Sequence, residues 1–312
     1  MSDYPFRLVD YAQSGPLADP ELLLERPFTA LDTSFAADAR RFVPGEALES
    51  AINTAIAVGD PLLITGEPGT GKTQTAYYAA YKLGVEPVIH FQVKSDSTAA
   101  HLLYHFDTVR YFHDAHLRRD DAPLDKHDYV EPRALWQAMT SETPRVLLID
   151  EIDKAPRDFP NDLLHELDKM EFTIAETGET IRAPRKKRPM VFITSNSERR
   201  LPEPFLRRCV YHHIRFDDDL VAKAVETRRD EYAALNDDVL KLAVERFLAL
   251  RDRSLRKPPA TGELLVWLRI LALAVGTYPG KIDRDLSRLP YLGVLLKDHQ
   301  DIEDLEAGRN RP

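Results

Sequence analysis

The hydrophobic positions of the chain begin with a helical period and then change to short, continuous apolar runs. Between residues 44 and 58, apolar side chains recur at helical spacing, which predicts an amphipathic helix. Gly59 and Asp60 end this helix, and the apolar run 62–64 is typical of a buried parallel strand. Four further runs predict strands of the same sheet: residues 87–93, 146–149, 190–194 and 210–214.

Helical patterns lie between most of these strands, over residues 74–83, 133–139 and 159–169. Strands that alternate with helices predict right-handed crossovers and a parallel sheet. Ligands of such sheets bind beyond the carboxyl ends of the strands. Polar residues that directly follow a predicted strand are therefore the first candidates for a functional site.

The strand pattern ends at about Arg215, and only helical patterns follow. The predicted helices cover residues 220–231, 239–250, 261–275 and a segment within 289–306. Residues 1–40 contain scattered proline and aspartate without a sustained period, which predicts an irregular extension. We therefore expect an N-terminal extension (1–40), an α/β core (41–216) and a C-terminal helical lid and tail (217–312).

The composition is that of an ordinary soluble protein, with 43% hydrophobic and 30% charged residues. Acidic residues outnumber basic ones by 51 to 42, and the net charge of −9 argues against gripping nucleic acid by bulk charge. The single cysteine, Cys209, cannot form an internal disulfide, so a reducing, cytoplasmic setting is expected. The first residues lack a secretory signal, and Arg269 interrupts the most apolar stretch, so we expect no membrane association.

Residues 66–73, GEPGTGKT, match the phosphate-loop pattern G-x-x-x-x-G-K-[ST]. Glycines let such a loop curl so that backbone N–H groups point at phosphate oxygens. Lys72 is expected to reach the β- and γ-phosphates, and the Thr73 hydroxyl to bind Mg²⁺. A chance match is the alternative, but this one follows a predicted strand and opens a predicted helix, as the motif requires. The predicted nucleotide-binding residues are Gly66, Glu67, Pro68, Gly69, Thr70, Gly71, Lys72, Thr73 and Gln74.

Two carboxylates follow the apolar strand at 146–149. Asp150 is placed to hold the Mg²⁺ shell together with Thr73, and Glu151 to polarise the attacking water as general base. A solvated acidic turn is common after an isolated strand, but a phosphate loop upstream favours the catalytic interpretation. The strand at 87–93 falls between the two motif strands, an arrangement found in nucleoside triphosphatases with a catalytic glutamate.

Two later segments provide further candidates. Asn196 follows the strand at 190–194, where its carboxamide can hold the attacking water without adding charge, although Ser-Asn is also ordinary turn chemistry. Arg207 and Arg208 end a short predicted helix before the fifth strand. An arginine delivered to the γ-phosphate of a neighbouring subunit stabilises transition-state charge. The alternative is a pair of surface arginines that complement a helix C-terminus.

The segments GEPGTGKT, LLIDEIDKAP, ITSNS and PEPFLRRC, in this order, resemble the AAA+ superfamily over roughly residues 41–275. The extra sequence at 95–128 and a predicted β-hairpin at 171–181, turning near Gly178, resemble the MoxR group of AAA+ ATPases. The resemblance implies an α/β P-loop NTPase core with a parallel sheet of about five strands, followed by a small all-α lid domain. It also implies ATP rather than GTP.

The resemblance further implies a homo-oligomeric ring, commonly a hexamer, with ATP at subunit interfaces. Arg208 is then the first candidate for the finger and Arg207 the second. MoxR-like ATPases act as chaperone-like remodellers of a protein client, often with a partner that bears a von Willebrand factor A domain. The group usually carries a sensor-2 arginine at the start of the third lid helix. No arginine stands there in this chain, and Lys257 or Arg256 is the candidate substitute.

Two other functions remain open at this point. A slowly hydrolysing, nucleotide-controlled assembly switch, such as those of bacterial defence or conflict systems, is favoured by the missing sensor-2 arginine. A nucleic-acid motor of the same fold is opposed by the net charge. The basic run at 185–188 could contact an acidic partner, but such runs are usually solvated loops.

Overall fold

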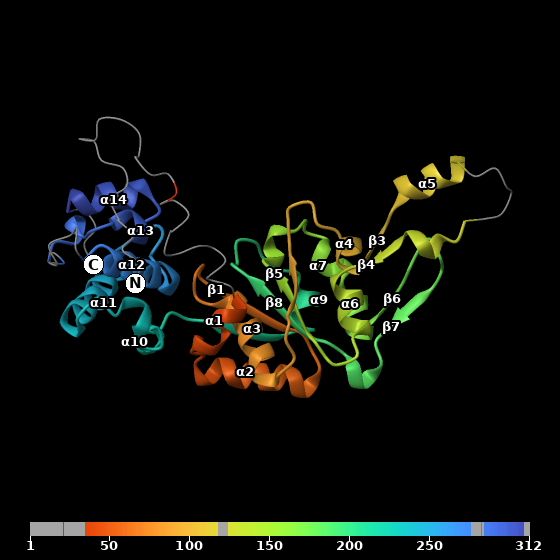
Figure 1. Ribbon diagram of the computed structural model, residues 1–312, viewed down its shortest axis with the longest axis horizontal. Coiled ribbons are helices and arrows are strands. Elements are labelled where there is room, and N and C mark those ends of the chain that lie inside the picture. The colour runs from red at the N-terminus through yellow and green to blue at the C-terminus, as the bar shows by residue number, and fades with distance from the viewer. Residues whose placement is uncertain (1–20, 22–34, 118–123, 276–281, 283, 309–312) are drawn as a thin grey trace. The chain divides into compact units, whose positions relative to one another are not determined.

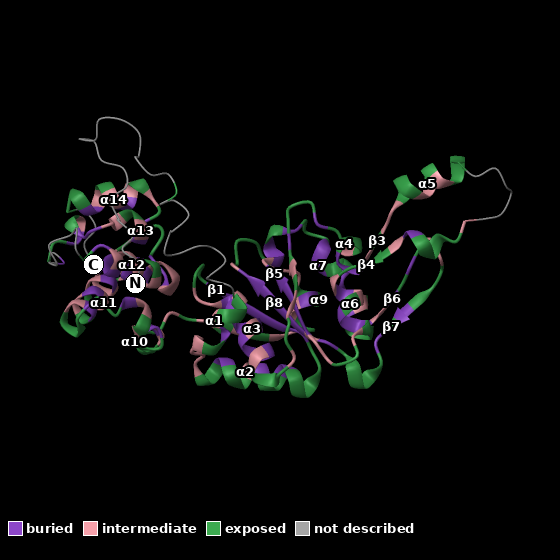
Figure 2. Cartoon of the chain, viewed as in Figure 1, coloured by how far each residue is buried: buried purple, intermediate pink, exposed green. Residues whose placement is uncertain are grey.

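Five parallel strands form the central sheet of the computed structural model, which describes residues 21, 35–117, 124–275, 282 and 284–308 (Figure 1). In sheet order they are β2 (Ile89–Gln92), β5 (Val146–Asp150), β8 (Met190–Ser195), β1 (Leu62–Gly66) and β9 (Val210–Ile214). The three central strands are almost entirely buried (Figure 2). The predicted parallel sheet of about five strands is confirmed, as is the all-helical C-terminal part.

The order of the strands corrects one expectation. Along the chain β2 comes between β1 and β5, but in the sheet β8 separates them and β2 lies at the edge beyond β5. Leu63 and Leu147 flank β8 through parallel pairing with Ile193 and Val191 respectively. This matters for the site because the carboxyl ends of β5, β8 and β1 are direct neighbours.

The helices around the sheet begin with α2 (Glu46–Val58), which the sequence predicted, and α3 (Lys72–Leu83), which packs against β1, β5 and β8. The remaining helices of this part are α4 (Ala99–Leu103), α5 (Thr108–Leu117), α6 (Ala134–Thr140), α7 (Phe159–Asp162), α8 (Leu164–Lys169) and α9 (Glu203–Leu206). One continuous helix was predicted at 159–169, but the structure has two. The break falls at Leu163, whose side chain is completely buried.

Two small antiparallel ribbons lie outside the main sheet. In the extra sequence, β3 (Tyr104–Phe106) pairs with β4 (Val130–Pro132), and α5 extends from this ribbon with no buried residue (Figures 1 and 2). The predicted hairpin is formed by β6 (Glu171–Thr173) and β7 (Thr180–Arg182). Its turn contains Gly178 at φ 75°, a backbone conformation that favours glycine.

Two compact units divide the described chain. The α/β unit comprises Pro44–Glu67 and Lys72–Arg215, and the helical unit comprises the described parts of Met1–Val43, Pro68–Gly71 and Phe216–Pro312. The helices of the second unit are α1 (Phe35–Asp38), α10 (Asp218–Glu226), α11 (Asp237–Arg251), α12 (Thr261–Leu273), α13 (Leu292–Leu295) and α14 (His299–Glu306). No helix of the described residues combines the length and the apolar character needed to cross a membrane.

Three expectations about the helical unit need correction. The segment at 289–306 forms two helices, because Asp298 accepts hydrogen bonds from Gln300 N and Asp301 N and so caps a new one. The pattern at 220–231 ends as a 3₁₀ turn, Arg229–Tyr232. In the predicted irregular extension, residues 35–41 form α1 and a 3₁₀ turn, whereas residues 1–20 and 22–34 lie outside the described residues. Tertiary contacts order this segment, since Arg41 pairs with Asp230 and Glu231.

Candidate functional site

The phosphate loop connects β1 to α3, as the motif requires. Gly66, Gly69 and Gly71 have φ angles of 151°, 75° and 90°, which bulkier residues rarely adopt, so the sequence GEPGTGKT is needed for this backbone path. Glu67 and Pro68 are exposed and Thr70 is half-buried, whereas Gln74 on α3 is buried.

Lys72 is the first residue of α3 and is only 6% exposed. Its Nζ donates to the carbonyl oxygens of Gly66 at 3.0 Å and Glu67 at 2.8 Å. Burial lowers the pKa of Lys72, and the nearby carboxylates, Asp153 foremost, oppose that shift. The ammonium therefore lies inside the curl of the loop, where a phosphate would compete with the two carbonyls for it.

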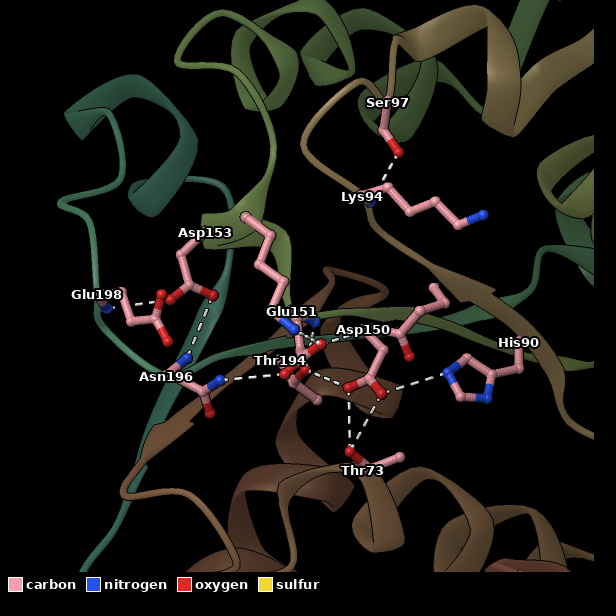
Figure 3. Close-up of polar contacts among 12 residues, drawn as sticks. Thr73, His90, Lys94, Ser97, Asp150, Glu151, Asp153, Thr194, Asn196 and Glu198 are labelled. Atoms are coloured by element: carbon pink, nitrogen blue, oxygen red, sulfur yellow. Dashed lines mark hydrogen bonds and ion pairs between the residues drawn. The ribbon is translucent and has the colours of Figure 1, made fainter. Parts of the chain in front are cut away.

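Thr73 and Asp150 meet although 77 residues separate them (Figure 3). Thr73 Oγ1 donates to Asp150 Oδ1 at 3.0 Å and Oδ2 at 3.2 Å. Thr194, on the neighbouring strand β8, donates from Oγ1 to Asp150 Oδ1 at 2.5 Å. Burial alone would raise the pKa of Asp150, but hydrogen bonds from His90, Thr194 and Thr73 outweigh it and lower the pKa. Asp150 is thus a buried carboxylate held ionised, as a metal ligand must be.

Glu151 begins the turn after β5 with a left-handed backbone, φ 60° and ψ 51°. Its N–H donates to Thr194 Oγ1 at 2.8 Å, so one hydroxyl ties down both carboxylate residues. Asn196 Nδ2 donates to Glu151 Oε1 at 3.2 Å. Gln92 Nε2 and Lys154 Nζ donate to the other oxygen, Oε2, at 2.7 and 2.5 Å.

The segment after β8 is held by a second buried carboxylate, that of Asp153, which is 3% exposed. Asp153 accepts from the backbone N–H of Asn196 at 3.2 Å and of Glu198 at 3.0 Å (Figure 3). These bonds fix the backbone that carries the Asn196 carboxamide. The structure therefore brings together Thr73, Asp150, Glu151 and Asn196, four of the residues selected from the sequence.

The arginine candidates lie at a different place in the same unit. Arg208 Nε donates to Asp168 Oδ2 at 2.6 Å, and its Nη1 to Pro204 O at 2.9 Å. Arg207 has an 80% exposed side chain and a looser ion pair with Glu203 at 3.6 Å. In the described part of the chain, their ion pairs are thus made with residues outside the network around Asp150.

Lys257 belongs to the helical unit. The backbone N–H groups of Arg256 and Lys257 donate to Asp301 Oδ1 and Oδ2 at 2.9 and 3.1 Å, and both side chains are exposed. The carboxylate of Asp301 is 1% exposed, so it anchors this loop to α14. The sensor-2 role of Lys257 or Arg256 stays a prediction.

The sequence interpretation missed several residues of the site: His90, Gln92, Asp153, Lys154 and Thr194. A signal was present for some of them, because Gln92 and Thr194 are polar residues at the carboxyl ends of predicted strands. His90 was less visible, since it lies inside β2 and reaches Asp150 only because β2 pairs with β5.

A phosphate loop after β1, an Asp-Glu pair after β5 and a polar segment after the intervening β8 define a P-loop nucleotide-binding fold of the AAA+ class. Residues 61–209 match the family model of the AAA domain, dynein-related subfamily.

Among solved structures, the chain is similar to the crystal structure of a putative ATPase from Cytophaga hutchinsonii. The identity is 14% and the TM-score 0.40, over 88% of this chain and 92% of that one. A likeness this weak carries no argument about function. No curated protein matches the sequence.

Proposed function

We propose that the chain is an ATPase of the MoxR type that binds Mg·ATP and hydrolyses it at the subunit interfaces of a ring, thereby remodelling a client protein. One observation carries the hydrolytic part of this proposal. Thr73, Asp150, Glu151 and Asn196, from three separate segments, form with Thr194 one hydrogen-bonded network at the carboxyl edge of the sheet. The hexameric ring and a partner with a von Willebrand factor A domain rest on the resemblance alone, and the cytoplasmic location rests on the single cysteine.

The oxygen donors at this edge suit magnesium. Mg²⁺ prefers hard oxygen ligands, and the Thr73 hydroxyl and the ionised Asp150 carboxylate already converge within 3.0 Å. Bound magnesium would neutralise the charge that develops on phosphate oxygens. The positive φ angles of the loop glycines allow its N–H groups to turn toward phosphate, which supports the fit of a nucleotide.

Each side chain then has a defined task. Lys72 exchanges its two loop carbonyls for phosphate oxygens, and Thr73 with Asp150 holds the metal. Glu151 accepts a proton from the attacking water, and Asn196, held beside Oε1 of Glu151, orients that water. Arg208 of a neighbouring subunit stabilises the charge of the transition state.

A second candidate is a nucleotide-controlled assembly switch that hydrolyses slowly. The specific observation in its favour is that Glu151 Oε2 already accepts from both Gln92 and Lys154. A carboxylate oxygen with two donors is a poor proton acceptor. Rapid hydrolysis would therefore need at least one of these donors to move away when subunits assemble.

Turnover measured against protein concentration separates the two candidates. A rate per subunit that climbs steeply as rings form supports the remodelling ATPase, whereas negligible turnover with ATP-stabilised oligomers supports the switch. Stimulation by DNA with a steep salt dependence would instead indicate a nucleic-acid motor.

Two variants test the site itself. Glu151→Gln is expected to retain ATP and lose hydrolysis, and Lys72→Ala to lose ATP binding. Turnover of Glu151→Gln equal to that of the parent would remove Glu151 as the base. Because Glu151→Gln should remain in its ATP state, it is also the variant to use for capturing a client.

A further inference from the structure

Asp150 has a partner that belongs to none of the nucleotide-binding motifs. His90, on β2, places Nε2 3.3 Å from Asp150 Oδ2 (Figure 3). The other ring nitrogen, Nδ1, lies 3.0 Å from the hydroxyl oxygen of Tyr77 on α3. The Tyr77 ring also contacts the imidazole edge-on, with centroids 6.1 Å apart. A continuous polar chain therefore runs from Tyr77 through His90 to Asp150.

The ionised state of Asp150 fixes the direction of its bond with His90. An ionised carboxylate can only accept, so Nε2 of His90 must carry the hydrogen that faces Asp150. In the tautomer that carries its hydrogen on Nε2, Nδ1 is an acceptor that matches the Tyr77 hydroxyl as donor. Burial, followed by the charge of Asp150, raises the pKa of Tyr77, so this hydroxyl keeps its hydrogen at neutral pH. The position of the Tyr77 hydroxyl, 3.0 Å from Nδ1, is compatible with the tautomer that donates to Asp150.

His90 and Thr73 both contact the carboxylate of Asp150, but only Thr73 is a predicted metal ligand. The Thr73 hydroxyl contacts both oxygens of Asp150 and is itself a predicted metal ligand, so its position would depend on the metal. Thr194 and His90 are not predicted ligands and can keep their bonds, Thr194 to Oδ1 and His90 to Oδ2. Each carboxylate oxygen of Asp150 thus has one partner that is not itself a predicted metal ligand.

We propose that His90, held by Tyr77, is a positioning residue for the magnesium site and sets the Mg²⁺ concentration at which the site fills. The physical reason is that hydrogen bonds to a metal-binding carboxylate fix its orientation, and their loss typically lowers metal affinity by about 10- to 100-fold. The inference rests on the proposed function, because it requires Mg²⁺ to bind beside Asp150.

The test is a magnesium titration that needs no turnover. A fluorescent, non-hydrolysable ATP analogue is bound to the full chain in EDTA, and Mg²⁺ is then added until the signal reaches its plateau. Four variants are compared with the parent. His90→Ala removes the donor, and His90→Gln keeps an N–H near the position of Nε2. Tyr77→Phe removes only the hydroxyl, and the fourth variant is His116→Ala. The last is the matched control, because His116 is an exposed histidine on α5.

We expect His90→Ala to raise the half-saturating Mg²⁺ concentration at least about tenfold, and Tyr77→Phe by less. His90→Gln should recover most of the loss, and His116→Ala should match the parent. Binding of the analogue in EDTA should be similar in all variants, because His90 faces the carboxylate of Asp150 rather than the phosphate loop.

The outcomes distinguish failure of the proposed role of His90 from failure of the proposed function. If the parent binds the analogue with a Mg²⁺ requirement but His90→Ala and His90→Gln share its half-saturation point, His90 has no positioning role and the proposed function stands. If the parent shows no Mg²⁺-dependent binding at all, both proposals fail. If His90→Ala does not fold, Tyr77→Phe decides: a half-saturating Mg²⁺ concentration equal to that of the parent would overturn the proposal that Tyr77 holds His90 in this role.

Discussion

Arg208 donates from Nε to Asp168 Oδ2 across 2.6 Å, so the arginine selected as the finger is paired within its own chain. Both side chains are partly exposed, at 44% and 38%, and ion pairs of this kind contribute only about 0–1 kcal/mol. The pair is therefore weak enough to be exchanged for a phosphate in the proposed ring. The neighbouring Arg207, 80% exposed, has no comparable restraint.

The two arginines should differ in their effect on turnover. We expect Arg208→Ala to lower the hydrolysis rate of the assembled protein by about 10³-fold or more, while ATP binding to the single subunit is retained. Arg207→Ala is the matched control and should lose far less. Steady-state hydrolysis and nucleotide binding, measured for both variants at the same oligomeric state, decide the point. A larger loss in Arg207→Ala would transfer the finger to that residue.

Thr194 should be a structural requirement of the site, because its one hydroxyl donates to Asp150 and accepts from the Glu151 N–H. Thr194→Val keeps the volume and leaves both groups without this partner, which is expected to lower the free energy of unfolding by about 2 kcal/mol. Hydrolysis should fall with it, since both carboxylates lose their alignment. Thr194→Ser retains the hydroxyl and is the control. Urea unfolding and ATP turnover of the two variants test this, and equal behaviour of Val and Ser would contradict it.

Tyr232, in the helical unit, differs from Thr194 in the hydrogen bonding of its buried hydroxyl. Its side chain is completely buried, and among the described residues its hydroxyl oxygen has no hydrogen-bond partner. Burial raises the pKa of this phenol. An unpaired buried hydroxyl costs about 1–3 kcal/mol, so Tyr232→Phe should leave stability unchanged or increase it by about 1 kcal/mol. Thermal or urea unfolding measures the change, and a clear loss of stability would mean that the hydroxyl is bonded after all.

Cys209 is expected to be unreactive in the folded protein. Burial, followed by the charges of Asp60 and Asp168, raises the pKa of its thiol to about 12, and the thiol donates to Phe205 O. Because the thiolate is the reactive form, labelling with a disulfide reagent at pH 8 should be slower by about a thousandfold than in urea-unfolded protein. The labelling rate can be followed by absorbance. Rapid labelling of the native protein would show that this thiol is accessible and ionised.

Some of the architecture follows from the sequence alone. The apolar runs predicted all five strands of the main sheet, and the motifs at 66–73 and 150–151 directly follow two of them. A parallel sheet brings the carboxyl ends of its strands to one edge, so the contact between Thr73 and Asp150 follows from the two motifs. Local periodicity and turn residues contain this information, because each depends on neighbours within a few positions.

The order of the strands and the partners of Asp150 and Glu151 were decided by the tertiary structure. Sequence periodicity does not tell which strands are adjacent, so the placement of β8 between β1 and β5, which brings Thr194 and Asn196 to the carboxylates, was not predictable. The same holds for His90 and Gln92, whose side chains reach Asp150 and Glu151 only through the pairing of β2 with β5. The physical reason is that a motif specifies its own backbone, whereas the groups that surround it come from strand pairing between distant segments.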